Sequence, residues 1–220
     1  MKKLQSVILD MDGVISDSEP LHVAAERKTL LSFGVEVSLE DLQVFLGKGI
    51  EYMLETFIRS YSLDISYKAL YELHQKNLID AFRQGVKPID GILELIHHMA
   101  KNNVSLAVAS SSSSRIIQLV LEQFKITSFF HAVVSGDEVE NGKPAPDIFI
   151  EALRRMECPA DSGVVIEDSP SGVAAAKRAG IKCVGFKSPN SGNQDLSEAD
   201  WITDDLGVLN VQTLESLLLD

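Results

Sequence analysis

The fold is decided by the stretch LQSVILDMDGV, residues 4–14. Its first part, Leu4–Leu9, is typical of a β-strand and ends in a continuous apolar run that suits a strand buried on both faces. Two acids, Asp10 and Asp12, follow at once, and Gly13 relaxes the steric limits where the chain leaves the strand. An acid after an apolar strand is commonly a turn residue or a helix cap. The stretch alone therefore predicts a buried strand and leaves the role of its acids open.

The pattern of the chain changes at Pro88. Before it, the apolar spacing predicts amphipathic helices at 20–33, 39–46, 50–61 and 66–83. After it, helical stretches alternate with short strands, which are expected at 104–109, 132–134, 163–166, 182–185 and 201–202. This alternation predicts an α/β fold: a Rossmann-like doubly wound parallel sheet of residues 1–16 and 88–220, interrupted by a helical insertion at 17–87.

Composition limits the classes of partner. The 20 basic and 32 acidic residues give a net charge of −12, which argues against nucleic acid or an anionic membrane as the main partner. The sequence has no apolar run of roughly 18 residues, so no membrane-spanning helix is expected, and the apolar start is too short for a signal peptide. Cys158 and Cys183 are widely separated, which favours neither a disulfide framework nor a zinc site and fits a reducing cytoplasm. No protein partner is implied.

Polar side chains gather where the predicted strands end. In an open parallel sheet, ligands bind in the crevice beyond the carboxyl ends of the strands. The residues at these ends, or in the loops that follow, comprise four carboxylates, one hydroxyl and one ammonium: Asp10, Asp12, Ser110, Lys143, Glu167 and Asp168. The sequence therefore predicts one polar site at this edge of the sheet.

With these residues in their order, the sequence resembles the haloacid dehalogenase superfamily of hydrolases. It is most similar to the subgroup that contains β-phosphoglucomutase and related sugar-phosphate phosphatases. The motifs that carry the resemblance are LDMDGV at 9–14, AVASS at 107–111, GKPAPD at 142–147 and IEDSPSG at 166–172. They occur in the family's order and near its usual separations, and the resemblance covers nearly the whole chain outside the insertion.

The resemblance implies phosphoryl transfer through an aspartyl phosphate. Asp10 would attack phosphorus, because an ionised carboxylate is an oxygen nucleophile with no proton to lose. Asp12 would protonate the leaving alcohol and then take a proton from the incoming water or hydroxyl group. Together these roles imply a phosphotransferase whose substrate is a small phosphorylated metabolite.

The resemblance also implies Mg²⁺ as cofactor. The family places the ion between the Asp10 carboxylate, the Asp12 backbone carbonyl and Asp168, and Glu167 would support it directly or through water. Hard oxygen ligands suit Mg²⁺, and a cation must screen the negative nucleophile from the negative phosphate.

Three further residues are expected to bind the phosphoryl group. Ser110 would donate a hydrogen bond, the amide of Ser111 would help, and Lys143 would supply positive charge against both the phosphate and Asp10. Each has a simpler structural alternative. Ser110 could merely end its strand, Ser111 could be a turn residue, and Lys143 could be a solvated loop charge.

In this family, helices inserted after the first strand form a C1-type cap that closes over the active site. Residues 17–87 resemble that cap domain. Within it, His22 and Lys76 match positions that handle substrate in β-phosphoglucomutase, although a structural histidine and an exposed lysine are the alternatives. Closure of such a cap would exclude bulk water from the reaction.

One departure from the mutase pattern affects the predicted reaction. After the turn at 46–49 the mutase carries an arginine that grips the second phosphate of a sugar bisphosphate, whereas this chain has Ile50 and Glu51 there. Lys48 is the nearby cation, and a point charge replaces a bidentate arginine poorly. We therefore expect a phosphomonoester hydrolase acting on a small sugar or polyol phosphate. The alternatives are a phosphosugar mutase, a phospho-acceptor signalling domain and an inactive binding protein.

Overall fold

The computed structural model describes residues 3–45 and 50–219, so Lys48 lies outside the described residues. The chain divides into two compact units. The first comprises Met1–Asp17 and Lys87–Asp220, and the second comprises Ser18–Val86.

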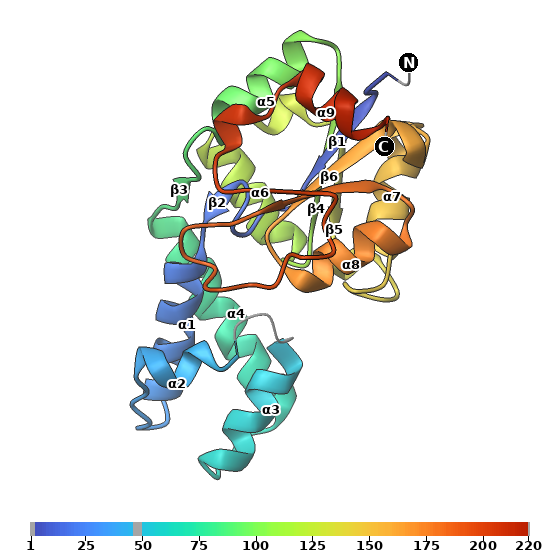
Figure 1. Ribbon diagram of the computed structural model, residues 1–220. Helices are drawn as coiled ribbons and strands as arrows, with labels where there is room; N and C mark the ends of the chain where they lie inside the picture. Colours follow the sequence, from blue (N-terminus) through green and yellow to red (C-terminus); the bar gives the residue numbers. More distant parts are fainter. Residues whose placement is uncertain (1–2, 46–49, 220) are drawn as a thin grey trace. The chain divides into compact units, whose positions relative to one another are not determined.

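The first unit is built on a six-stranded parallel sheet (Figure 1) with the strand order β5-β4-β1-β6-β7-β8. The first strand of the sequence thus lies near the middle of the sheet, and the order reverses where β1 meets β6. The strands are β1 (Ser6–Leu9), β4 (Ser105–Ser110), β5 (Ala132–Ser135), β6 (Gly163–Glu167), β7 (Lys182–Phe186) and β8 (Trp201–Thr203). The predicted α/β fold with a parallel sheet is confirmed.

Helices flank this sheet. They are α5 (Ile92–Lys101), α6 (Ser114–Gln123), α7 (Asp147–Met156), α8 (Pro170–Arg178) and α9 (Val211–Leu217). On one face, apolar side chains of α7 and α8 pack with alternate residues of the strands in a single core that includes Ile8, Phe149, Val165 and Cys183. All four residues of β1 are buried, as expected of a strand covered on both faces, and the last three form the apolar run that predicted it.

The strand register places the acids that follow β1. Leu9 pairs with Val108 of β4 and with Ile166 of β6, so the three strands end at the same level. The Asp10 N–H extends this ladder by donating to the Ile166 carbonyl at 3.0 Å. Residues just beyond these strands therefore meet at one edge of the sheet, as the alternation of strands and helices predicted.

The second unit consists of four helices: α1 (Glu19–Leu31), α2 (Leu39–Gln43), α3 (Ile50–Ser60) and α4 (Tyr67–Gln84). Their apolar faces enclose a separate core that includes Leu30, Leu54, Phe57 and Leu70. A buried polar contact also joins α1 to α4, because the Asn77 amide donates to the Thr29 hydroxyl at 3.0 Å. Each predicted helical stretch of the insertion overlaps one of these helices.

Two very short strands mark the passage between the units. β2 (Ser16–Asp17) pairs in antiparallel fashion with β3 (Lys87–Pro88), where the chain leaves the first unit and returns to it. The sequence does not predict these strands, because a strand of two residues carries no detectable alternation. Within residues 3–45 and 50–219, no helix has the length and apolar character needed to cross a bilayer.

Candidate active site

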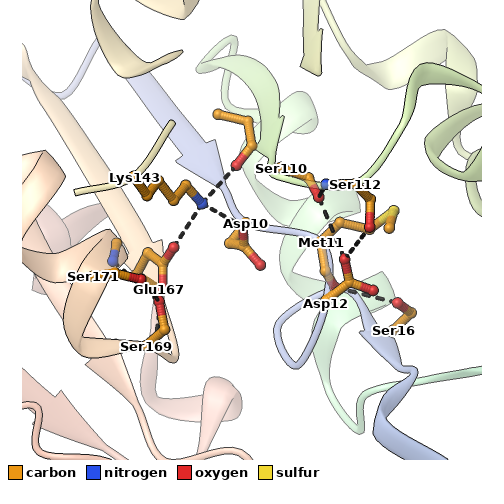
Figure 2. Close-up of polar contacts among 12 residues, drawn as sticks. Asp10, Met11, Asp12, Ser16, Ser110, Ser112, Lys143, Glu167, Ser169 and Ser171 are labelled. Carbon is orange, nitrogen blue, oxygen red and sulfur yellow. Dashed lines mark hydrogen bonds and ion pairs between the residues drawn. The ribbon is translucent and has the colours of Figure 1, made fainter. Parts of the chain in front are cut away.

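Asp10 occupies the centre of the polar site. Its side chain is almost fully buried just beyond the end of β1. The Lys143 ammonium donates to Asp10 Oδ1 at 2.5 Å. Figure 2 shows Asp10 between two groups of side chains, with Lys143 and Glu167 to one side and Asp12 to the other. The residue predicted to be the nucleophile thus lies between a positive charge and a second carboxylate.

Lys143 is held by three oxygen acceptors. Besides Asp10, its ammonium donates to Glu167 Oε1 at 2.7 Å and to the Ala109 carbonyl at 3.0 Å. These bonds use all three N–H donors of the side chain. Burial opposes its positive charge, yet the adjacent Asp10 and Glu167 carboxylates raise the pKa of Lys143 above its ordinary value. Lys143 is therefore a permanent cation in this site and not a solvated loop charge.

Both carboxylate oxygens of Glu167 are engaged. Oε1 accepts from Lys143, and Oε2 accepts from the backbone N–H and the hydroxyl of Ser169 at 2.8 and 2.9 Å. Ser169 also caps α8, since its Oγ accepts the Gly172 N–H at 3.0 Å. The carboxylate thus links Lys143 to the start of α8. Direct contact between Glu167 and a metal stays a prediction.

Asp12 is fixed by serines at the end of β4 and in the loop that follows it. The Ser112 hydroxyl donates to Asp12 Oδ2 at 2.7 Å, and the Ser110 hydroxyl makes a longer contact with the same atom at 3.4 Å. Ser110 Oγ in turn accepts the Ser112 N–H at 3.0 Å. After Asp12 the chain makes a tight turn, in which the Met11 carbonyl accepts the N–H groups of Ile15 and Ser16, both at 2.9 Å.

Asp168 lies beyond the end of β6 and is 8% exposed. Burial raises the pKa of this carboxyl to about 8, and the Glu167 charge adds to the rise. Its Oδ2 accepts a short hydrogen bond from the Ser191 hydroxyl. Gly13 packs directly against it, since a Cβ at position 13 would stand 2.0 Å from Asp168 Oδ2. With φ of +80° as well, position 13 requires glycine for both its backbone conformation and its contact.

The donor chemistry of this cluster fits Mg²⁺. Burial raises the pKa of Asp10 well above its ordinary value; the Lys143 ammonium opposes that rise, and Glu167, Asp168 and Asp12 add to it. Several carboxylates thus face one ammonium, and a divalent cation would neutralise the excess negative charge. Among the residues that the structure describes, no three His, Cys, Asp or Glu side chains are grouped as a metal site. The ligand set implied by the family resemblance needs only two carboxylates and a backbone carbonyl.

The structure also describes the remaining predicted residues other than Lys48. Ser111 is exposed in the loop after β4. In the helical unit, His22 lies on α1 with its ring 5.9 Å from that of Phe82, and Lys76 is exposed on α4. Their proposed contacts with substrate stay predictions.

Three serines of the cluster were not predicted as site residues: Ser112, Ser169 and Ser191. The run of serines at 110–114 signals hydroxyl groups near the strand end, but its local sequence does not single out Ser112. Ser169 lies inside the IEDSPSG motif but was given no role. Ser191 is 23 residues from its partner Asp168, and nothing in the sequence pattern connects the two.

Residues 7–186 match the haloacid dehalogenase-like hydrolases. The chain belongs to this family. The hydrolase is 32% identical, over 183 residues, to the phosphorylated carbohydrates phosphatase of Thermotoga maritima, an alignment that covers 81% of this chain and 83% of that protein. It is thus an enzyme, a phosphatase of the family, and the resemblance stated from its motifs is confirmed.

Solved structures agree on the fold of this hydrolase. CbbY from Rhodobacter sphaeroides in complex with phosphate superimposes with a TM-score of 0.87 at 24% identity, covering 96% of this chain and 99% of that one. A β-phosphoglucomutase from Clostridium difficile gives a TM-score of 0.82 at 21% identity, covering 98% and 97%. At these identities the likeness establishes the architecture only.

The packing of Glu167 against α8 makes a prediction for Gly172. A Cβ at this position would stand 1.7 Å from Glu167 Oε1 and 1.9 Å from its carboxyl carbon. We expect Gly172→Ala to displace Glu167 from Lys143, to lower the free energy of unfolding by roughly 1–3 kcal/mol and to reduce turnover. Thermal melts and phosphate-release kinetics measure both effects. Gly142→Ala is the control, since a Cβ there meets open space. Parental melting and turnover in Gly172→Ala would contradict this account.

Proposed function

We propose that this protein hydrolyses the phosphomonoester of a small sugar or polyol, with Mg²⁺ as cofactor and an aspartyl phosphate at Asp10 as intermediate. The observation that carries the proposal is the placement of Asp10 between a buried ammonium and a second carboxylate that serines hold in place. The similarity to a phosphatase named for phosphorylated carbohydrates supports the substrate class.

Asp10 suits the nucleophilic role. Lys143 binds Oδ1, which leaves Oδ2 as the oxygen that would attack phosphorus. The ammonium would stabilise the ionised form of the carboxylate and would oppose the charge that the phosphoryl group brings. Mg²⁺, when bound by Asp10, the Asp12 carbonyl and Asp168, would screen the nucleophile from the phosphate.

Asp12 suits general acid–base catalysis. The serine hydroxyls donate to its Oδ2, and this would orient the carboxyl group for transfer of a proton to the leaving alcohol. After the alcohol departs, the same carboxylate would take a proton from water as it attacks the aspartyl phosphate. The hydrogen bonds from Ser112 and Ser110 would fix the side-chain rotamer for both steps.

We assign hydrolysis in preference to the phosphosugar mutase reaction because of two residues in the helical unit. Ile50 and Glu51, where the mutase carries its arginine, begin helix α3 and present no cation. We also propose that residues 17–87 serve as the cap, on the strength of their insertion between β2 and β3. His22 and Lys76 remain candidates for specificity there. The free thiols Cys158 and Cys183 support a cytoplasmic site of action.

A phosphate-release screen tests the proposed function. Purified protein is incubated with a panel of sugar, polyol, nucleotide and protein phosphates, with Mg²⁺ or with excess EDTA. We expect inorganic phosphate from sugar or polyol monophosphates, and loss of that release in EDTA. The products of each hexose phosphate are analysed in parallel. If the protein isomerised a hexose phosphate without releasing inorganic phosphate, the proposed hydrolysis would be wrong and the mutase reaction would take its place.

A further inference from the structure

The segment between β7 and β8 reaches back to the candidate active site. Figure 1 shows it as a long orange-red excursion from the edge of the sheet. We call residues 188–194 the strap. Two consecutive residues of the strap contact distant segments of the first unit: Ser191 donates to Asp168 Oδ2, and Asn190 Nδ2 donates to Asp17 Oδ1 at 2.7 Å. Gln194 fixes the strap internally by donating to the Ser191 carbonyl at 2.9 Å.

The contact of Ser191 is part of a close three-way packing. A Cβ at position 13 would stand 2.0 Å from Asp168 Oδ2 and 2.8 Å from Ser191 Oγ. The strap, the turn after β1 and the end of β6 therefore meet at the Asp168 carboxylate. A carboxylate has two oxygens, so the hydrogen bond at Oδ2 orients the group and leaves Oδ1 to face a cation.

The hydrogen bond from Asn190 to Asp17 attaches the strap to a second segment, β2. Asp17 belongs to β2, which pairs with β3 through Ser16–Pro88 and Asp17–Lys87. This two-stranded ribbon is the place where the chain leaves the first unit and returns to it. Asn190 is itself exposed, so we expect its hydrogen bond to contribute less than the part-buried one made by Ser191.

We propose that the strap positions the metal-binding carboxylate: Ser191 holds Asp168 in the orientation that binds Mg²⁺, and Asn190 holds Ser191 in place through Asp17. This inference rests on the proposed function, since it concerns the same cation. Ser191 is a positioning residue that acts through Asp168. Hydrogen bonds to metal-ligating carboxylates commonly change metal affinity by about 10- to 100-fold.

The test is the affinity of the purified protein for Mg²⁺, measured by titration calorimetry without substrate. We expect Ser191→Ala to raise the dissociation constant by about tenfold and Asn190→Ala to raise it by a smaller factor. Turnover of Ser191→Ala should recover at saturating Mg²⁺, because the residue does not touch the reacting atoms. Ser197→Ala and Asn193→Ala, exposed positions of the same loop, are the matched controls and should bind as the parent does.

The outcomes separate this inference from the proposed function. If the parent binds Mg²⁺ and Ser191→Ala binds it within twofold of the parent, the strap has no positioning role and the proposed function stands. If the parent binds no Mg²⁺, both are overturned. Circular dichroism and melting temperature establish that each variant is folded. A weaker affinity shared by Ser197→Ala would also count against a specific role for Ser191.

Discussion

Asp10→Asn is expected to lower kcat for the best substrate by a factor of about 10⁴ or more, in the range seen when a covalent nucleophile is removed. The amide keeps the shape of the side chain, and its oxygen still accepts from Lys143 in place of Oδ1. It does not form a stable acyl phosphate, so the loss is chemical and the fold should persist. Steady-state phosphate release at saturating Mg²⁺ measures the effect.

Asp204→Asn provides the matched control for this substitution. Asp204 is exposed in the segment after β8, so the same change of charge there leaves the site intact. Its turnover should equal that of the parent. If Asp10→Asn also retained parental turnover, Asp10 would not be the nucleophile and the mechanism proposed for this site would be wrong.

Lys143→Met is expected to have the largest effect on stability. The substitution removes the ammonium that binds two buried carboxylates, Asp10 and Glu167, and leaves their charge uncompensated. Loss of one partner of such a buried pair costs about 3–5 kcal/mol. We also expect kcat to fall by about 10²- to 10³-fold, since a cation is lost beside the phosphoryl group. Urea unfolding and phosphate release measure the two effects.

The stability deficit of Lys143→Met should depend on pH. The pKa of Asp10 is already raised by burial, and Lys143 opposes that rise, so its removal raises this pKa further. A carboxyl with a raised folded-state pKa contributes stability at low pH and loses it as pH rises through that pKa. The deficit should therefore be largest at neutral pH and shrink as the pH falls and Asp10 becomes protonated. Lys101→Met, at an exposed lysine, is the control; a deficit independent of pH would contradict the charge argument.

Much of the fold could be predicted because its signals are local. The continuous apolar run before Asp10 predicts a strand buried on both faces, and β1 lies near the middle of the sheet. Strand ends in a parallel sheet share one edge, so the positions of Ser110 and Glu167 relative to Asp10 follow from the pattern of strands. The contacts of Lys143 follow less directly, since its loop had to be placed by resemblance to a known motif.

The remaining details depend on contacts between segments that are distant in the sequence. Ser112 and its neighbours in the serine run have similar local sequence, and only the loop geometry selects which hydroxyl donates to Asp12. Ser191 contacts Asp168 although α8, β7 and the start of the strap separate them in the sequence. The ribbon of β2 and β3 joins residues some 70 positions apart through two residue pairs, too few to leave a periodic pattern.

The central claim is that Asp10 carries the phosphoryl group during turnover, and chemical trapping tests it most directly. The protein is quenched during turnover of its best substrate with Mg²⁺, treated with borohydride and digested, and its peptides are analysed by mass spectrometry. Borohydride reduces an acyl phosphate to an alcohol, so we predict homoserine at position 10, and none when substrate or Mg²⁺ is omitted. Continued turnover with an unmodified Asp10, or with the reduced residue at another position, would contradict the account.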